Sequence, residues 1–211
     1  MTYNQIRDRS LKLINQYSIA GDQIASTYNN QQDYLYRIPS LVNDAMLAIS
    51  TSTRLLRSWV RADDLSYDTL ADQRIYDMPD DFWQFESGGF RGISPEGKIR
   101  KYTDYQFIGG KQVMIPEAEA NNLLLVEYCR RPERLPDEPD GKEELDVPEE
   151  AQAAIPYYVA AHLVMQDDSF QYASLYNEWE TKLDRLGELT RTELPEVDDQ
   201  YASFFEGSEA L

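Results

Sequence analysis

The sequence predicts an α+β fold: a bundle of N- and C-terminal helices with a small antiparallel β lobe inserted between them and an extended acidic tail. Apolar residues recur every three or four positions before residue 53 and again after residue 148, as on the buried face of a helix. Between these regions, short runs of β-branched and aromatic residues alternate with turn residues. The acidic segments 133–147 and 190–211 are interpreted as a linker and a tail.

Two helices are expected in the N-terminal helical region, residues 1–53. The first is predicted over Thr2–Tyr17, and a loop over Ile24–Asn30 precedes the second, which runs from Gln31 to about Thr53. Pro39 interrupts the second pattern. An interior proline bends a helix at a cost of about 3 kcal/mol, and the alternative is that a new helix starts there.

The region 54–132 is predicted to be the β lobe. The expected strands are Arg54–Arg61, Gln73–Met78, Asp81–Phe85, Lys98–Tyr102, Gln112–Ile115 and Leu123–Arg130. Turn signals separate them, and Gly109-Gly110 predicts a hairpin.

Two further helices are expected over 148–189. Pro148, with Glu149 and Glu150 after it, has the form of a helix start. Apolar spacing predicts a buried face of Ile155, Tyr158, Val159, His162 and Met165 on the first helix, and of Leu175, Trp179, Leu183 and Leu186 on the second. Pro156 leaves the same two alternatives open as Pro39, and the Asp167–Ser169 segment offers a cap for the second helix.

Composition excludes several classes of protein. The 211 residues are 42% hydrophobic, enough for one solid core and a second lobe. A net charge of −18 repels phosphate and argues against DNA binding as the primary activity. One cysteine and one histidine exclude an intramolecular disulfide and a Cys/His metal site. No apolar run has the length of a membrane span or the position of a secretion signal.

The pattern of side chains does not support a catalytic function. His162 lies on an apolar helix face with no nucleophile assigned to it, which predicts a core histidine. The pairs Asp63-Asp64 and Asp80-Asp81 are ordinary in so acidic a chain, and the second reads as a turn. Cys129 reads as a small apolar strand residue. The sequence therefore predicts a non-enzymatic protein without a metal or cofactor.

Two segments are candidates for docking. Arg54, Arg57 and Arg61 form a basic ladder beside Trp59, with a second cluster at Lys98, Arg100 and Lys101. We interpret these basic residues as solvent-facing strand residues or as a contact to an acidic neighbouring subunit; a groove for single-stranded nucleic acid is the alternative.

The acidic tail carries three aromatic residues, Tyr201, Phe204 and Phe205. Their presence predicts a partner-docking arm, because a purely solvating tail has no need of adjacent phenylalanines. A tail folded back on its own subunit is the alternative.

Several segments of the sequence resemble the sequences of one family of phage proteins. They are LINQYSIAGD and YLYRIPSLVNDAM near the N-terminus, YDMPDDFW at the entry to the strand-rich centre, VPEEAQAAIPYYVAAHLVMQDD, and YASLYNEWETKL. Over roughly residues 2–188 this order is similar to that of the head–tail connector, or adaptor, proteins of tailed bacteriophages. The larger β lobe departs from the all-helical members of that group.

The resemblance implies a virion structural protein, assembled in the host cytoplasm and located at the head–tail junction. It implies a ring, usually of twelve copies, that contacts the portal protein on one side and a neck, stopper or tail protein on the other. Genomic DNA then passes through the centre without sequence-specific binding, and no membrane is involved. A tail-tube or baseplate component is the first alternative, and a small phage enzyme is the second.

Overall fold

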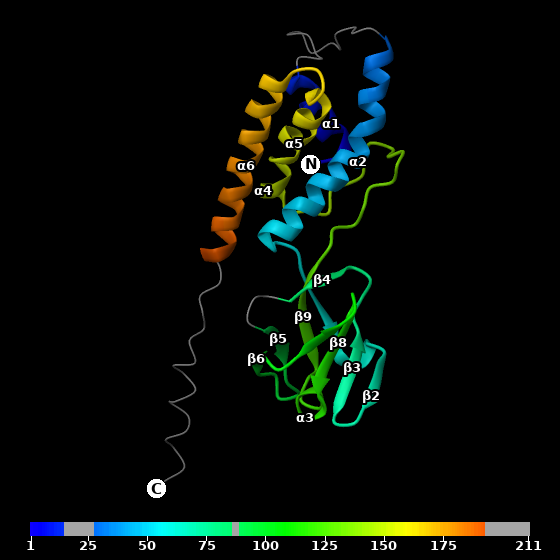
Figure 1. The fold of residues 1–211 in the computed structure, drawn as a ribbon, viewed down its shortest axis with the longest axis vertical. Helices are drawn as coiled ribbons and strands as arrows, with labels where there is room; N and C mark the ends of the chain where they lie inside the picture. The colour runs from blue at the N-terminus through cyan, green and yellow to red at the C-terminus, as the bar shows by residue number, and fades with distance from the viewer. Residues whose placement is uncertain (15–27, 86–88, 193–211) are drawn as a thin grey trace.

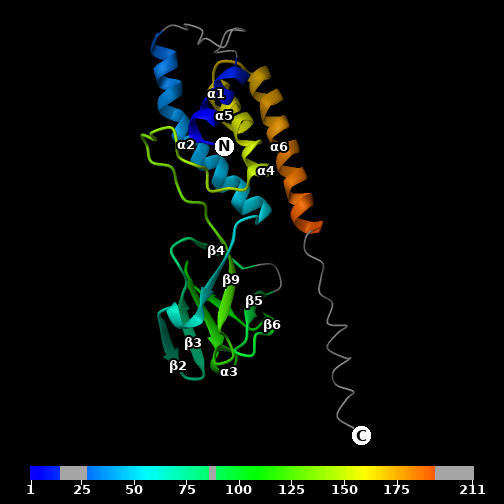
Figure 2. The ribbon, with the colours of Figure 1, turned by 180° about the vertical axis from the view of Figure 1, so that it is seen from behind.

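The computed structural model describes residues 1–14, 28–85 and 89–192. The chain forms a helical part and a β lobe that follow one another along the long axis of the molecule (Figures 1 and 2). Helices from both ends of the sequence build the helical part, and the residues between them build the lobe. The predicted α+β arrangement with antiparallel sheets is therefore confirmed.

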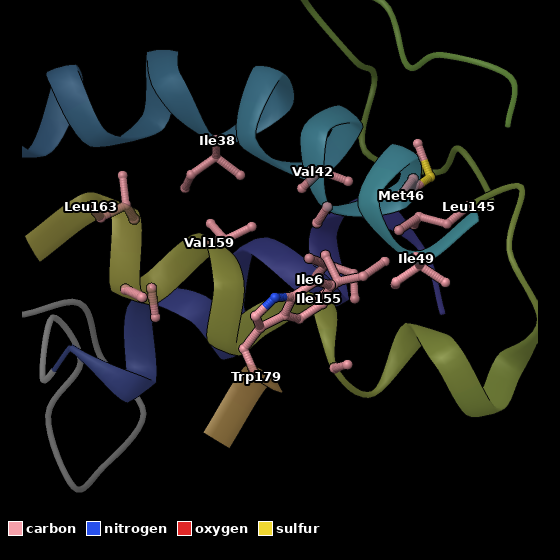
Figure 3. Close-up of a cluster of buried hydrophobic side chains, with 14 of the residues drawn as sticks. Ile6, Ile38, Val42, Met46, Ile49, Leu145, Ile155, Val159, Leu163 and Trp179 are labelled. Carbon is pink, nitrogen blue, oxygen red and sulfur yellow. The ribbon is translucent and has the colours of Figure 1, made fainter. Parts of the chain in front are cut away.

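The helical part is organised around a central apolar helix. Its elements are α1 (Tyr3–Leu13), α2 (Tyr28–Thr53), α4 (Glu149–Gln152), α5 (Ile155–Val164) and α6 (Ser169–Thr192). Helix α5 packs against α1, α2 and α6. Figure 3 shows Ile6, Val42 and Trp179 converging on this helix from three different elements. Burial of these apolar side chains is what joins the two ends of the sequence.

Local chemistry sets where the helices begin. The backbone N–H of Thr2 donates to Gln5 Oε1 at 3.0 Å, one half of a capping box for α1. Pro148 immediately precedes α4, as expected. Asp168 Oδ1 accepts from the backbone N–H groups of Phe170 and Gln171, so the cap expected for the last helix is confirmed.

The two prolines behave differently. Pro39 lies inside α2, whereas Pro156 lies in the first turn of α5. At Pro156 the new-helix alternative is the correct one, because the first turn of a helix does not need the missing N–H. Residues 148–165 therefore form two helices, α4 and α5, where one interrupted helix was predicted.

Other details of the helical prediction were wrong. Helix α2 begins at Tyr28, inside the expected loop. The described part of the first predicted helix is α1, which ends at Leu13, and residues 15–17 of that prediction lie outside the described residues. Met165 is 54% exposed because α5 ends at Val164, one residue before it. Helix α6 continues to Thr192, so residues 190–192 belong to this helix and not to the tail.

The β lobe contains two antiparallel sheets where a single lobe of six strands was expected. One sheet has the order β1-β9-β5-β6, with β4 also paired to β9, and the other has the order β2-β3-β8-β7. The strands of the first are β1 (Arg57–Arg61), β4 (Phe82–Gln84), β5 (Phe90–Ile93), β6 (Ile99–Tyr102) and β9 (Leu125–Arg130). Those of the second are β2 (Tyr67–Leu70), β3 (Gln73–Asp77), β7 (Gln106–Ile108) and β8 (Gln112–Pro116). Short turns, η1 (Ala62–Asp64) and α3 (Glu117–Ala120), connect them.

The lobe has an aromatic core of its own. Phe90 is fully buried and stacks on Tyr102 with ring centroids 5.0 Å apart, while Val113 and Ile115 reach the core from the second sheet. The hairpin predicted at Gly109-Gly110 is present, between β7 and β8. Because this core and the helical core are separate clusters, the protein has two independently packed centres.

Two chain segments connect the lobe to the helical part. The backbone N–H of Arg130 donates to Leu56 O at 2.9 Å, and Ser50 Oγ donates to Arg130 O at 2.8 Å. Arg130 also pairs with Asp146 through two hydrogen bonds, one of them 2.7 Å from Nη2 to Oδ1. These contacts tie the last strand of the lobe to the end of α2 and to the chain before α4.

Part of the expected acidic linker is fixed to the helical part. Asn43 forms two hydrogen bonds with the backbone of Leu135, at 2.8 and 3.0 Å, and the side chain of Leu135 is buried. Leu145 and Val147 are also in the helical core. The backbone N–H of Tyr3 donates to Glu143 O at 2.9 Å. Most acids of this segment are exposed, whereas Asp146 pairs with Arg130 and the few apolar residues anchor the segment to the helical part.

We predict that Arg130→Ala lowers the free energy of unfolding at pH 7 by about 1.5–2 kcal/mol, the lower part of the range for charge-assisted hydrogen bonds. The low value follows from side chains that remain 25% and 29% exposed. Hydrogen bonds from Arg130 hold the pKa of Asp146 below its ordinary value of 3.8. The folded state therefore binds fewer protons than the unfolded state near pH 3.8. The stabilisation from the ion pair is complete above about pH 3.8 and is lost as the pH falls through the lowered pKa of Asp146.

Urea unfolding of wild type and variant at pH 7 and at pH 3 measures this effect. The difference between the two proteins should shrink at the lower pH. Arg134→Ala, an exposed arginine in the same segment, is the matched control and should change stability by less than about 0.5 kcal/mol. An equal loss in both variants, or a difference independent of pH, would contradict the assigned role of the ion pair.

Candidate docking face

The outer face of the five-stranded sheet carries a row of basic side chains. In antiparallel pairs, directly opposed residues point to the same side, and Trp59 opposes Glu127 while Arg91 opposes Lys101. Val60 and Tyr128 point to the other side, into the lobe core. We define the basic face as the outward-pointing residues Arg57, Trp59, Arg61, Arg91, Lys101 and Glu127.

One buried carboxylate organises this face. Glu127 is 8% exposed and lies on β9, the strand between β1 and β5. Its carboxylate oxygens are 3.8 Å from Arg57 Nη1 and 3.2 Å from Arg91 Nε. The two arginines offset part of the free-energy cost of burying this carboxylate. The carboxylate in turn fixes the orientation of both guanidinium groups. Three neighbouring strands thus contribute to a single ion cluster.

The rim of the basic face is open to water. Arg61 and Lys101 are exposed, and Trp59 keeps 39% of its surface accessible between Arg57 and Arg61. Tryptophan and arginine are the residues that most often dominate the energetics of protein interfaces. The face therefore offers exposed charge and, on its edge strand β1, an aromatic side chain, in a protein whose net charge is −18.

The structure divides the predicted basic ladder. Arg57 and Arg61 share the outer face of β1, as expected from their even spacing. Arg54 lies before the strand, directly after α2, with a positive φ of 56°. In the second cluster, Arg100 opposes Gly92, on the side of the sheet away from Lys101. Arg91 was missed by the sequence reasoning, because only the strand order reveals that it shares the acid with Arg57.

The other predicted docking residues, Tyr201, Phe204 and Phe205, lie outside the described residues. Large apolar side chains are also exposed on the helical part. Phe170, in the first turn of α6, is 85% exposed, and Tyr36 of α2 is 83% exposed. Isolated exposed aromatics are common, but both are of the type enriched at subunit contacts.

The residues considered for catalysis have structural roles. The His162 ring stacks on Tyr158 with centroids 4.0 Å apart, and its Nδ1 lies 2.9 Å from Tyr158 O. Asp80 receives a hydrogen bond from Lys111 at 2.7 Å, which lowers the pKa of that carboxyl. Asp81 accepts one from the Tyr128 hydroxyl at 2.9 Å. Cys129 is buried in β9.

Across residues 1–14, 28–85 and 89–192, no group of three or more His, Cys, Asp or Glu side chains is placed to hold a metal ion. Within the same ranges, every helix is too short or too polar to cross a bilayer. The described part of the chain offers three surface features to a partner: a basic sheet face, exposed aromatic side chains and acidic segments.

A family model described as the SU10 adaptor protein matches residues 1–202. The chain belongs to the SU10 adaptor protein family. The resemblance to phage adaptor proteins is thereby confirmed, and the match includes the β lobe as well as the helices. A search of curated proteins finds no significant match. Membership in a family of phage adaptors agrees with a surface suited to docking and is consistent with a non-enzymatic role.

Proposed function

We propose that this SU10-family adaptor forms a ring beneath the portal, joins the capsid to the tail, and lets genomic DNA pass through its centre. The family match over residues 1–202 carries the proposal. A negative molecule gives little non-specific grip on the duplex, which supports passage of DNA without sequence-specific binding. The partners are then the portal protein, a neck, stopper or tail protein, and further copies of the chain, twelve in all.

Within the ring, the basic face is the surface that contacts an acidic part of the neighbouring subunit. A closed ring uses heterologous contacts, in which two different patches of each subunit meet. The basic face supplies a positive patch. Acidic patches are abundant elsewhere, for example at Asp137, Glu138 and Glu144, which are exposed.

The experiment that tests the proposed function combines purified adaptor with purified portal rings of the same phage. Mass photometry should detect the portal mass increased by a whole number of adaptor subunits, and a tagged portal should retain the adaptor in a pull-down. Isolated adaptor can remain monomeric, because a template offsets the entropy of association. An adaptor that neither forms rings alone nor binds the portal would rule the proposal out.

We predict that the double variant Arg61→Glu and Lys101→Glu weakens ring assembly on the portal by about tenfold or more. Both side chains are exposed, so the fold should not change. The matched control is Arg100→Glu, an exposed residue of the same strand that points to the other side of the sheet. Mass photometry at increasing adaptor concentration gives the midpoint of assembly. Equal weakening by the control would mean that net charge, and not this face, controls assembly.

A further inference from the structure

A second positively charged feature lies in the helical part, away from the basic face. A pocket of about 380 Å³ is formed between α1, the start of α5 and α6. It is lined by Arg9, Lys12, Leu13, Ala153, Pro156, Tyr157 and Lys182. Three of these seven are cationic, and the lining that the described chain provides contains no acidic side chain. We call it the cationic pocket.

The electrostatics of the cationic pocket favour an anion. The Lys182 ammonium lies 4.8 Å from the centroid of the Tyr157 ring, and this contact holds the cation at the pocket lining. Arg9 Nη1 contacts the Met1 sulfur at 3.4 Å, and a thioether is only a weak acceptor. Pro156 lies in the first turn of α5, where the helix dipole adds partial positive charge. Bringing such groups together costs repulsion that an entering carboxylate offsets.

The sequence contains a segment with the complementary chemistry. Residues 193–211 contain six acids, Glu193, Glu196, Asp198, Asp199, Glu206 and Glu209, and no lysine or arginine. The same segment contains Tyr201, Phe204 and Phe205, which suit the apolar part of the lining around Leu13 and Tyr157. We propose that the cationic pocket is the receiving site for the acidic segment 193–211 of a neighbouring copy. This assignment rests on the proposed ring assembly and names the contact that connects adjacent subunits.

A neighbouring copy is favoured over the same chain by the direction of α6. Lys182 precedes Thr192, the last residue of α6, by ten positions, a distance of about 15 Å along the helix. A segment that entered its own pocket would have to reverse direction and return along α6. A neighbour's segment has no such constraint, and nineteen extended residues span up to about 65 Å. The pocket and the segment thus form the two unlike halves of a heterologous contact.

Peptide binding tests the site itself. The receptor is the full chain with the six acids of its own segment changed to Gln or Asn, and the probe is a fluorescein-labelled peptide with the sequence of residues 193–211. Fluorescence anisotropy should detect binding that weakens as salt is raised. Arg9→Glu with Lys182→Glu should weaken it about tenfold or more, whereas Arg185→Glu, an exposed residue of α6 outside the pocket, should not. Absence of binding, or equal loss in all variants, overturns the proposal.

Cross-linking identifies the source of the segment. A carbodiimide joins lysines to carboxylates, so portal-bound assemblies made from mixed ¹⁴N- and ¹⁵N-labelled wild-type protein should yield mixed-isotope peptides. These should join Lys12 or Lys182 to residues 193–211. Cross-links found only within single chains would refute docking between copies. If the adaptor does not bind the portal although the peptide still binds the pocket, the proposed function fails and the pocket assignment stands.

Discussion

Replacing Trp179 by alanine is expected to lower the free energy of unfolding of the helical part by about 3–5 kcal/mol, the range for removing a large aromatic from a core. Trp179 is 2% exposed and packs on Tyr158 with ring centroids 5.0 Å apart. It connects α6 to α5, the helix on which α1 and α2 also pack (Figure 3). Since the free energy of unfolding of a native protein is only about 5–15 kcal/mol in total, this loss is large enough to destabilise the whole helical part.

Urea unfolding with two observables checks this expectation. Circular dichroism at 222 nm follows the helices, and fluorescence of the remaining Trp59 and Trp83 follows the β lobe. The helical transition should move to lower urea by more than the fluorescence transition, because the two cores are separate. Phe170→Ala, on the same helix but 85% exposed, should shift neither. An unchanged helical midpoint in the Trp179 variant would mean that the two ends of the chain are not held together by this core.

Deleting the acidic arm is expected to abolish attachment to the portal or to the adjacent subunit while leaving thermal stability nearly unchanged. The deletion should remove residues 193–211, not 190–211, because α6 continues to Thr192. The aromatic residues Tyr201, Phe204 and Phe205 serve as anchors in this hypothesis, and the acids steer the arm toward a basic surface.

Two measurements on the truncated protein decide whether the arm docks. Differential scanning calorimetry should place its unfolding midpoint within about 2 °C of wild type, the shift that corresponds to a loss of less than about 0.5 kcal/mol. The portal pull-down should lose its signal. As a control, the full-length triple variant with Tyr201, Phe204 and Phe205 changed to Ser should lose attachment to a similar degree. A truncated protein that unfolds much earlier, or that still assembles, would count against a docking arm.

Periodic apolar spacing identified the parts of this fold that depend on local pattern. Ile38, Val42 and Ile49 recur at helical intervals and are all buried, as are Leu175 and Leu186. Strand β9 was recognisable because its apolar run lies in the middle of a sheet, flanked by other strands. In each case the pattern and the burial come from the same periodicity.

Features that depend on distant partners were missed. Strand β2 is exposed along its whole length and therefore has no apolar alternation, and β5 is only four residues long with a glycine inside it. An acid within the apolar run at Glu127 could have signalled a cationic partner, but choosing Arg57 and Arg91 requires the order of the strands. Leu135 and Leu145 are too widely spaced for any period, so their anchoring role was invisible in the sequence.

The pairing of Leu56 with Arg130 also has a consequence for how the chain folds during synthesis. The apolar faces of α1 and α2 emerge first, whereas α5 and α6, their partners, follow only after the β lobe. At bacterial elongation rates this leaves the N-terminal helices without partners for on the order of 5–20 s. The first and last strands of the lobe, β1 and β9, pair with each other and are both synthesised before α5, so the lobe can close first. Its closure holds the chain ends side by side, so the remaining helices fold as though joined by a short turn, with a smaller loop-closure entropy. The inserted lobe can thus fold before the longest-range contacts form and bring the flanking helical segments close together.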